Sequence, residues 1–516
     1  MNLFLDLDFG RRFAPEEFFF GVANAPYLCE GGYNTEHGPK NNYGYREADG
    51  RVPVSGETTR FWENYREHIE LAANIGMTAF RTGVDWARVQ PTLVLAPGEA
   101  PAWDESALDH YADILRCVID HGMEPIVTLH HFANPAWLGD TLWTREESSS
   151  ALSGYQAEVA GQLGRRLAST GHAPIGHFVT VNELNLISLR YYREDRINEK
   201  AGAIAKNLFA LAADNILTAH VLCYDAIKAL YEVEGWVEPR IGFGTASQSS
   251  YEHDKMMLDI VRLRTEGVER QAASDFLKVR KEQWRRRLDS LARRHLDDAQ
   301  SDSYFALAND AALSIEVSDL TRTLDSIYAS SRDSKIDFIS ANIYEPFEIA
   351  RLYGDVSLGV PWWELTVDGD IYSTMIHAYN DGNDGLPMYM GENSIAYEQA
   401  PNEPAVPRPD GWTRERYLKT YLMEMIKCMA QGVPIRGYLY WSLVDDFEWH
   451  AGFTPRLGLY NYDYRTHTIM PTDGLGEDAG DTYRQLVAAL RSGDSQTIQD
   501  VFVRSLAVWS GESHAH

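Results

Sequence analysis

Eight short runs of β-branched and aromatic residues recur along the chain, and longer stretches with helical patterning separate them. The runs are typical of strands and lie at 18–23, 78–84, 124–130, 177–181, 240–245, 336–343, 387–390 and 435–442. Between them, apolar residues recur at helical spacing in stretches such as 59–75, 106–121, 152–169, 203–231 and 414–431. Eight strands alternating with helices predict an α/β fold, a closed (β/α)8 TIM barrel, in preference to an open doubly wound sheet. No glycine-rich phosphate loop follows any run, which argues against a nucleotide-binding sheet.

The alternation also bears on the number of domains. A length of 516 residues ordinarily suggests roughly two to four domains. Because strands and helices alternate along nearly the whole chain, we expect a single catalytic domain over residues 1–516. The segment at about 251–331 is strongly helical and contains the basic run KVRKEQWRRR, so we expect a helical insertion after the fifth strand. Its interleaved charges favour a solvated helix face, and a lid or an oligomer contact stays open as an alternative.

The charge balance narrows the class of partner. Lys and Arg number 47 and Asp and Glu number 75, so the formal net charge at pH 7 is −28. A negative field of this size repels phosphate backbones and anionic lipid headgroups, so we expect neither nucleic acid nor a membrane as a partner. A small neutral ligand is not repelled. The 13 Trp, 28 Tyr and 19 Phe residues offer flat apolar faces for ring-shaped ligands.

Cysteine usage and the start of the chain suggest the compartment. The first residues carry acids inside their only apolar stretch and do not resemble a secretory signal, and no uncharged apolar run is long enough to cross a bilayer. The four cysteines lie far apart and form no CxxC pair, which argues against a disulfide scaffold or a zinc site. We therefore expect a cytoplasmic protein without a metal or cofactor. A homo-oligomer remains open.

Polar and acidic side chains follow several of the runs. In a barrel of this kind, reactive groups lie at the carboxyl ends of the strands. Glu183 follows the fourth run and Glu392 the seventh, and the neighbouring run ends supply Arg81, His131, Asn182, Asn342, Tyr344, Trp441, Glu448 and Trp449. A pair of carboxylates among amides and indoles suits the cleavage of a glycosidic bond, because one acid can protonate the departing oxygen while the other stabilises an oxocarbenium-like centre.

Six sequence blocks in order carry a resemblance to a known family. They are FFFGVANAPYLCEG, AFRTGVDWARVQP, EPIVTLHHFANPAWL, TVNELN, YMGENSIAY and GYLYWSLVDDFEWHAGFTPRLGLYNYDY. The chain resembles family 1 glycoside hydrolases, the β-glucosidase family of retaining enzymes, over nearly its whole length except the helical insertion and the C-terminal tail. The resemblance implies an exo-acting O-glycoside hydrolase that removes a terminal β-linked sugar by double displacement.

The resemblance also implies roles for individual residues. Glu183 falls on the general acid/base and Glu392 on the nucleophile, whose carboxyl groups should lie about 5 to 5.5 Å apart. Arg81, Asn342 and Tyr344 fall on positions that support the nucleophile, and a nearby guanidinium lowers a carboxylate pKa. The positions that grip the sugar are His131, Asn182, Trp441, Glu448 and Trp449. Asp445 and Asp446 are expected to be loop or helix-start residues, not catalysts.

This chain departs from the family pattern at several places. Leu28 replaces a glutamine that binds two ring hydroxyls, so we expect relaxed or altered sugar specificity. The other departures are Phe132, Leu184, Gly391 and Ser394, where the family has Trp, Pro, Thr and Gly. Three alternatives stay open: a metal-dependent barrel hydrolase, a transglycosidase, and a sugar-binding protein with weak or lost hydrolase activity.

Overall fold

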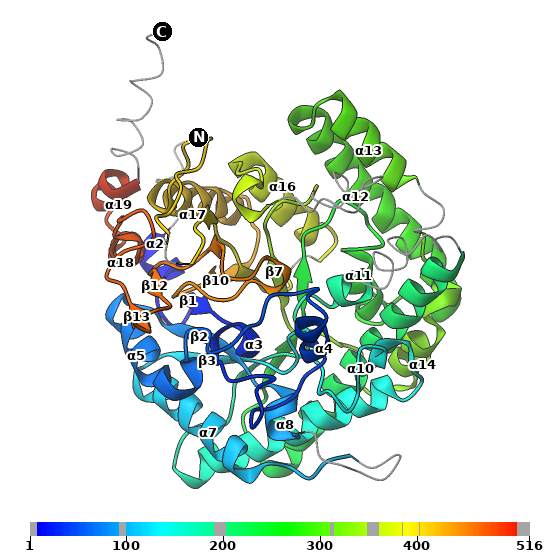
Figure 1. The fold of residues 1–516 in the computed structure, drawn as a ribbon. Coiled ribbons are helices and arrows are strands. Elements are labelled where there is room, and N and C mark those ends of the chain that lie inside the picture. The colour runs from blue at the N-terminus through cyan, green and yellow to red at the C-terminus, as the bar shows by residue number, and fades with distance from the viewer. Residues whose placement is uncertain are drawn as a thin grey trace.

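A closed ring of parallel strands forms the centre of the molecule. The computed structural model describes residues 8–91, 100–189, 203–309, 314–347, 361–383, 385–401 and 403–502. Within these residues, nine strands form one sheet in the order β5-β4-β3-β2-β1-β10-β8-β7-β6 (Figure 1). They are β1 (Phe19–Ala23), β2 (Ala79–Gly83), β3 (Glu124–Thr128), β4 (His177–Val179), β5 (Arg240–Gly242), β6 (Gly244–Ala246), β7 (Ile339–Asn342), β8 (Met388–Glu392) and β10 (Ile435–Trp441). The predicted (β/α)8 barrel is confirmed.

The fifth barrel strand is divided, and this differs from the single run expected at 240–245. β5 pairs with β4, whereas β6 pairs with β7, and Phe243 lies between the two pieces. Because the two pieces follow each other directly, they close the ring with one strand that bends from one neighbour to the other. Strand bends of this kind are a usual way to curve a sheet into a barrel.

Helices surround the ring on its outside, apart from short ones that lie over the barrel end facing the viewer in Figure 1. They are α2 (Phe9–Arg12), α3 (Pro26–Cys29), α4 (Tyr43–Ala48), α5 (Phe61–Asn74), α6 (Trp86–Val89), α7 (Glu105–Asp120), α8 (Ser148–Ser169), α10 (Ala203–Glu234), α11 (Met256–Val261), α12 (Ala273–His295), α13 (Asp298–Ala308), α14 (Thr321–Ala329), α16 (Gly369–Asn380), α17 (Arg414–Ala430), α18 (Ala479–Ser492) and α19 (Ser495–Phe502). Their ends follow local sequence: Asp104 caps α7 by accepting from Ala107 N, and Gly493 in the left-handed region ends α18. No helix of the described ranges combines the length and apolar composition needed to cross a bilayer.

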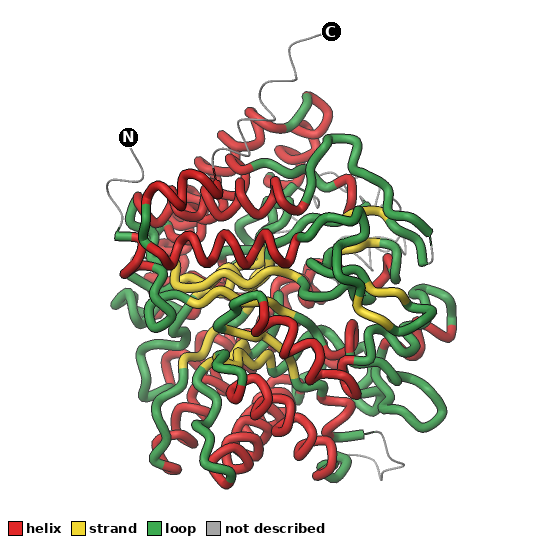
Figure 2. The backbone as a smooth tube through the Cα atoms, turned by 90° about the vertical axis from the view of Figure 1, so that its left-hand side faces the viewer, coloured by secondary structure: helices red, strands yellow, loops and turns green. Residues whose placement is uncertain are grey.

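The apolar residues form two cores. The larger lies between the strands and the surrounding helices, and the smaller fills the barrel and continues toward its mouth. Inside the barrel, Phe19 packs against Tyr389 with ring centroids 4.7 Å apart. A Cβ at Gly437 would stand 2.0 Å from the Phe19 ring, so a glycine is needed there. Loops and short strand pairs gather at one end of the barrel (Figure 2).

The segment expected to be a helical insertion contains α11, α12, α13 and α14. Ion pairs join the charged face of α12 to its neighbours: Lys281 to Glu252, and Arg287 to Asp381. The basic residues are therefore partly engaged in contacts with other elements, although Arg286 and Lys278 remain exposed. α12 and α13 project beyond the helix ring at the upper right (Figure 1).

Candidate active site

The two predicted catalytic carboxylates lie at the same end of the barrel. Glu392 is the last residue of β8, and Glu183 follows β4 by four residues, with a positive φ of 45°. Their exposed fractions are only 5% and 7%. Asn342, the last residue of β7, pairs with Glu392 across the sheet and donates from Nδ2 to Glu183 Oε1 at 2.9 Å. One amide thus connects the two acids.

Glu392 is held by a buried arginine. Arg81 on β2 is fully buried and donates from a guanidinium nitrogen to Glu392 Oε1 at 2.8 Å and to the Gly391 carbonyl at 3.0 Å. Its Nε donates to Thr128 Oγ1 at 3.0 Å. Burial raises the pKa of Glu392, and the charge and hydrogen bond of Arg81 oppose this rise. The arginine therefore favours the ionised form that a nucleophile needs.

Tyr344 approaches Glu392 from the loop after β7. Its hydroxyl donates to Glu392 Oε2 at 3.5 Å, which is a long contact. Burial raises the pKa of Tyr344, and the negative charges of Glu392, Glu183 and Glu448 raise it further. The phenol therefore keeps its proton and serves as a donor. Because Glu392, Glu183 and Glu448 all affect its pKa, Tyr344 lies close to all three carboxyl groups.

Asn182 and His131 form a second polar contact in the site. Asn182 Nδ2 donates to His131 Nε2 at 3.0 Å, and Asn182 Oδ1 accepts from Arg81 at 2.6 Å. Burial lowers the pKa of His131, and Arg81 and His130 lower it further, so the imidazole is neutral. His130 has its ring 5.2 Å from Trp143, whereas the His131 ring lies 5.7 Å from Trp441. The two adjacent histidines thus face different surroundings.

Aromatic rings form the wall next to His131. The Trp449 ring lies 6.1 Å from His131, 5.5 Å from Tyr27 and 5.0 Å from Phe132. Leu28 on α3 is fully buried in the same apolar cluster. Phe447 N donates to its carbonyl at 3.2 Å, so the first and eighth strand loops are joined there. The apolar side chain of Leu28 cannot form a hydrogen bond with a ligand.

Glu448 and Asp446 add two more acids to the site region. Burial raises the pKa of Glu448 well above its usual range, and the charges of Asp446, Glu392 and Glu183 raise it further. Burial also raises the pKa of Asp446 strongly, followed by the charge of Asp445. Neither side-chain oxygen of Asp446 has a hydrogen-bond partner among the described residues. This carboxyl lies in a loop, and its electrostatic link to the site is not apparent from the sequence.

Thr128, Asn393 and Tyr438 also position the site, and none was assigned such a role from the sequence. Thr128 orients Arg81, as described. Asn393 donates to the Ile343 carbonyl at 2.6 Å and accepts from the Tyr438 hydroxyl at 3.0 Å, so it joins β8 to β7 and β10. The position of Asn393 next to Glu392 is the only signal that the sequence offers. The partners of these residues are far away in the chain.

A comparison with known protein families shows which family the chain belongs to. The sequence profile described as Glycosyl hydrolase family 1 matches residues 11–473. The chain belongs to glycosyl hydrolase family 1. It is therefore a glycoside hydrolase by family, and the matched range contains every site residue described above. Helices α18 and α19 lie beyond the match.

Family 1 relatives differ in their named substrates. A beta-galactosidase from Sulfolobus acidocaldarius is 24% identical, over 88% of this chain and 92% of its own. A 6-phospho-beta-galactosidase 1 from Streptococcus pneumoniae is 23% identical, over 88% and 94%. Among solved structures, a family 1 β-glucosidase from Thermotoga maritima in complex with isofagomine lactam has a TM-score of 0.66 at 20% identity, covering 92% of this chain and 98% of its own. At this identity the structural likeness shows the fold.

Proposed function

We propose that this chain is a retaining, exo-acting β-glycosidase that hydrolyses a terminal β-linked sugar from a small neutral glycoside. Glu392 is the nucleophile and Glu183 the general acid/base in this proposal. The observation that carries it is the pairing of buried Glu392 with Arg81 at 2.8 Å, next to a second carboxyl that Asn342 joins to the same site. Two acids with different partners are what this chemistry requires.

The first step forms a covalent intermediate. A carboxylate oxygen of Glu392 attacks the anomeric carbon while the bond from that carbon to the leaving oxygen breaks. Glu183 gives its proton to the leaving oxygen. Arg81 favours the ionised form of Glu392 beforehand, and the Tyr344 hydroxyl donates to its other oxygen. The ester bond joins the sugar to Glu392 when the aglycone leaves.

The second step releases the sugar. Glu183, now ionised, takes a proton from water as the water oxygen attacks the anomeric carbon. The ester bond to Glu392 breaks and returns the carboxylate, so both acids regain their starting state. The two inversions retain the configuration at the anomeric carbon.

The sugar is held by His131, Asn182, Glu448 and the indoles of Trp441 and Trp449 in this proposal. Acceptors and donors at these side chains suit hydroxyl groups, and flat rings suit the C–H faces of a sugar. Leu28 removes one hydrogen-bonding position, which supports a relaxed or altered choice of sugar. Comparing rates on gluco, galacto and fuco aryl glycosides tests this, and strict preference for glucose would count against it.

We also propose a reducing, cytoplasmic compartment. All four cysteines are buried and form no disulfide among the described residues. Measuring the free thiol content of the protein isolated from its own cells tests this proposal.

Covalent labelling tests the catalytic roles. A 2-deoxy-2-fluoro glycoside with a good leaving group should accumulate as an ester, and peptide mass mapping should find it on Glu392. Glu183→Ala should still be labelled when the leaving group needs no proton, and azide should restore its turnover to a β-glycosyl azide. Glu392→Gln should not be labelled, whereas Glu364→Gln, an exposed control, should behave as the wild type. A label on any other residue would overturn the assignment.

A further inference from the structure

Ser394 follows Glu392 by two residues, and the mechanism described above gives its hydroxyl no task. Only 6% of Ser394 is exposed, and its Oγ is buried without a hydrogen-bond partner of normal geometry among the described residues. Buried hydroxyls ordinarily have a partner, because an unpaired polar group is costly to bury. The family pattern has glycine at this position, so the hydroxyl is a feature of this chain.

The sheet places Ser394 beside Tyr344. The last residue of β7 pairs in register with Glu392, the last residue of β8, and Tyr344 and Ser394 each lie two residues beyond this pair. Residues at equal steps from a register pair of parallel strands lie side by side, and every second residue faces the same side. The chains stay joined past the strand ends, because Ile343 N donates to the Glu392 carbonyl at 3.0 Å and Asn393 Nδ2 to the Ile343 carbonyl at 2.6 Å.

Tyr344 and Ser394 also line the same small cavity. Its volume of about 20 Å³ suits one water molecule at most, so no group of a substrate separates the two hydroxyls. Tyr344 is held from other sides, because its backbone N donates to Ser247 Oγ at 3.3 Å and its ring meets the Trp362 ring edge to face at 5.0 Å. The phenol oxygen is therefore fixed between Glu392 Oε2, at 3.5 Å, and the side chain of Ser394.

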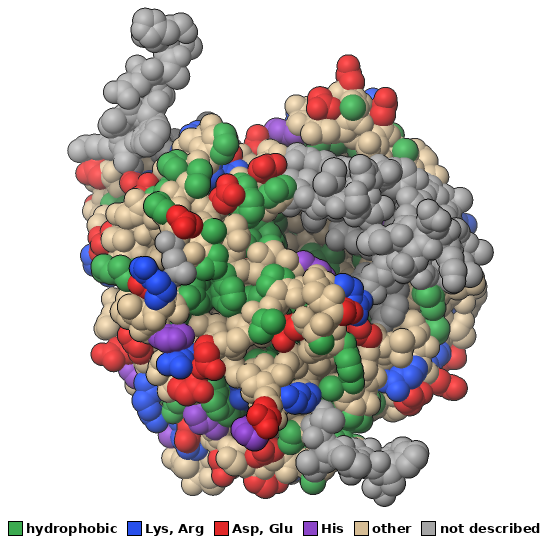
Figure 3. All heavy atoms as spheres, in the orientation of Figure 1, with side chains coloured by type: hydrophobic (Ala, Val, Ile, Leu, Met, Phe, Trp, Pro, Cys, Tyr) green, Lys and Arg blue, Asp and Glu red, His purple; other side chains and the backbone are tan. Residues whose placement is uncertain are grey.

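The charged groups that face Tyr344 indicate the direction of the hydrogen bond. Glu392 on β8, Glu183 after β4 and Glu448 after β10 all raise the pKa of the phenol, whereas a hydrogen bond with Ser394 lowers it. A partner that lowers the pKa of a phenol donates to its oxygen, which leaves the phenol proton for Glu392. Among the described residues, many charged side chains of this face lie round its margin, and hydrophobic and uncharged ones lie over its centre (Figure 3). The acids that act on the phenol are thus the buried ones of the site.

Two more charged residues line the cavity. Arg408 donates to the Asp410 carboxylate at 2.6 Å and to the Leu365 carbonyl at 2.8 Å, so its charge is paired. The Glu345 carboxylate accepts from Thr366 N at 2.9 Å. Both groups are therefore engaged by their own partners, and the hydroxyl of Ser394 is left to serve Tyr344.

We infer that Ser394 is a positioning residue for the proposed nucleophile: its hydroxyl donates to the Tyr344 oxygen and so directs the phenol proton toward Glu392. The inference rests on the proposed function, because it concerns the ionised form of Glu392 that attacks in the first step. A hydroxyl that accepts one hydrogen bond donates more strongly in the next, so Ser394 acts through Tyr344. Arg81 favours the same ionised form from β2 and has the larger effect.

The pH profile of kcat/KM on an aryl glycoside tests the inference. Its acid limb reports the ionisation of Glu392 in the free enzyme. Ser394→Ala and Ser394→Gly both remove the hydroxyl, so the phenol should donate less strongly and the pKa of Glu392 should rise. The acid limb should therefore move to higher pH by roughly 0.3 to 0.5 unit, which is part of the shift that Tyr344→Phe produces.

A double-mutant cycle shows whether Ser394 acts through Tyr344. In the Tyr344→Phe background, Ser394→Ala should not move the acid limb further. Ser153→Ala is the matched control, because Ser153 on α8 is similarly buried and its hydroxyl donates to the Ser150 carbonyl at 3.3 Å. The control should keep the wild-type profile. Thermal unfolding checks that each variant is folded.

The outcomes separate the two proposals. If Glu392 takes the fluoro glycoside label and neither Ser394 variant moves the acid limb, the inference is wrong and the glycosidase proposal stands. An equal shift with and without the Tyr344 hydroxyl would also overturn it, since Ser394 would then act by another route. If the fluoro glycoside labels no carboxylate at all, the glycosidase proposal fails first. A shift that occurs only when Tyr344 is intact supports the role of Ser394.

Discussion

Gly391 directly precedes the proposed nucleophile, and its missing side chain leaves room for two neighbours. A Cβ built on Gly391 would stand 2.2 Å from Ser340 Oγ and 2.7 Å from Asn342 Oδ1. Both distances are far below normal van der Waals contact, so a side chain at residue 391 would force at least one of these neighbours to move. Asn342 is the amide that contacts Glu183, and hence the size of residue 391 bears on the geometry of the site. This explains why glycine stands where the family pattern has threonine.

Gly391→Ala should lower kcat by at least about tenfold by displacing Asn342, the amide that donates to Glu183. Ser340→Ala alone should be close to the wild type, because no contact of Asn342 depends on that hydroxyl in the described structure. In the double variant the 2.2 Å conflict with Ser340 is gone but the 2.7 Å conflict with Asn342 remains, so the activity should stay low. Steady-state kinetics on one aryl glycoside measures all four proteins. An active Gly391→Ala enzyme would mean that Asn342 is not needed where it lies.

Asp446 makes stability depend on pH. Its folded pKa is raised well above the ordinary 3.8 by burial, so the folded state prefers the protonated acid. The unfolded chain ionises at lower pH, and the free energy of unfolding therefore falls as the pH rises through the interval between the two pKa values. Each pKa unit in that interval corresponds to about 1.4 kcal/mol.

Asp446→Asn removes the carboxyl group whose ionisation lowers the free energy of unfolding. The variant should be more stable than the wild type at pH 7, and the gain should shrink as the pH falls below the ordinary pKa of 3.8, where both states hold the proton. Urea unfolding at several pH values measures it. Asp445→Asn is the comparison: burial also raises the pKa of Asp445, but its carboxylate accepts from Gly458 N at 2.8 Å and from Asn461 at 2.9 Å, so its loss should lower stability at pH 7. A gain for Asp446→Asn that does not change with pH would contradict the argument.

The residues of the site were predictable to different degrees. Glu183 and Glu392 stand at strand ends inside recognisable blocks, so sequence alone proposes them. Thr128 and Tyr438 act on the site only because β3 and β10 place them beside Arg81 and Asn393. Such contacts join positions far apart in the chain, and no local pattern indicates them.

Strands and helices could be predicted from the sequence where a pattern of neighbouring residues indicates them. The strand runs are rich in β-branched and aromatic residues, and helices such as α7 have a strong apolar face and a capping acid, so both could be found. The division of the fifth strand at Phe243 could not, because it depends on which neighbours, β4 and β7, each half meets.

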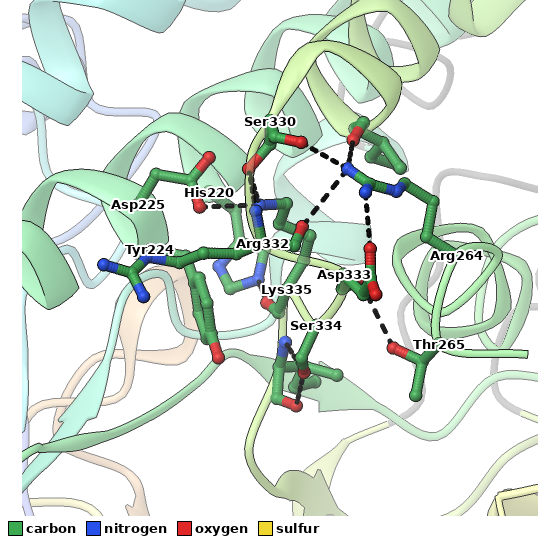
Figure 4. A network of polar contacts seen from close by, with 12 residues as sticks. His220, Tyr224, Asp225, Arg264, Thr265, Ser330, Arg332, Asp333, Ser334 and Lys335 are labelled. Carbon is green, nitrogen blue, oxygen red and sulfur yellow. Dashed lines mark hydrogen bonds and ion pairs between the residues drawn. The ribbon is translucent and has the colours of Figure 1, made fainter.

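A polar network attaches the end of α14 to the barrel (Figure 4). Arg264 donates to the carbonyls of Ile327, Ser330 and Arg332 and pairs with Asp333. These carbonyls lie at and beyond the carboxyl end of α14, where helices leave such groups without partners inside the helix.

Nearby, Lys335 pairs with Asp225 at 2.6 Å, and its carbonyl accepts from His220 Nε2 at 2.7 Å. Burial lowers the pKa of His220 to about 4, so this histidine is neutral and donates from one nitrogen only. The network thus connects α10 with the segment that leads from the end of α14 to the start of β7.

Arg264→Ala should lower the free energy of unfolding by roughly 2–3 kcal/mol, because the carbonyls of Ile327, Ser330 and Arg332 lose the charged donor that they share. Arg264→Lys should recover little of this, since an ammonium group cannot reproduce the fork of contacts. Arg270, which pairs with Asp325 on the surface, is the matched control, and Arg270→Ala should cost less than about 1 kcal/mol. Guanidinium unfolding of the three variants decides the matter, and equal losses for the two alanine variants would refute the role of the network.

The electrostatics of the whole molecule limit the substrate. The net charge is −28, and the site itself contains Glu183, Glu392, Glu448 and Asp446. Arg81 is the only cation among the site residues described above, and Glu392, Gly391 and Asn182 take its hydrogen bonds. A phosphorylated sugar would bring a further negative charge into this environment, and the site residues that the structure describes offer it no free cation.

The enzyme should therefore prefer a neutral glycoside to its 6-phosphorylated counterpart, although one family relative is named a 6-phospho-beta-galactosidase. We expect kcat/KM for the phosphorylated substrate to be at least roughly 100-fold lower, because moving a phosphate from water into a partly buried site without a cationic partner costs several kcal/mol. Salt screens the long-range repulsion between the phosphate and the net charge of −28. The ratio of kcat/KM for the neutral substrate to kcat/KM for the phosphorylated one should therefore decrease as ionic strength rises. Equal rates on the two substrates at low salt would show that the site does not select against an anion.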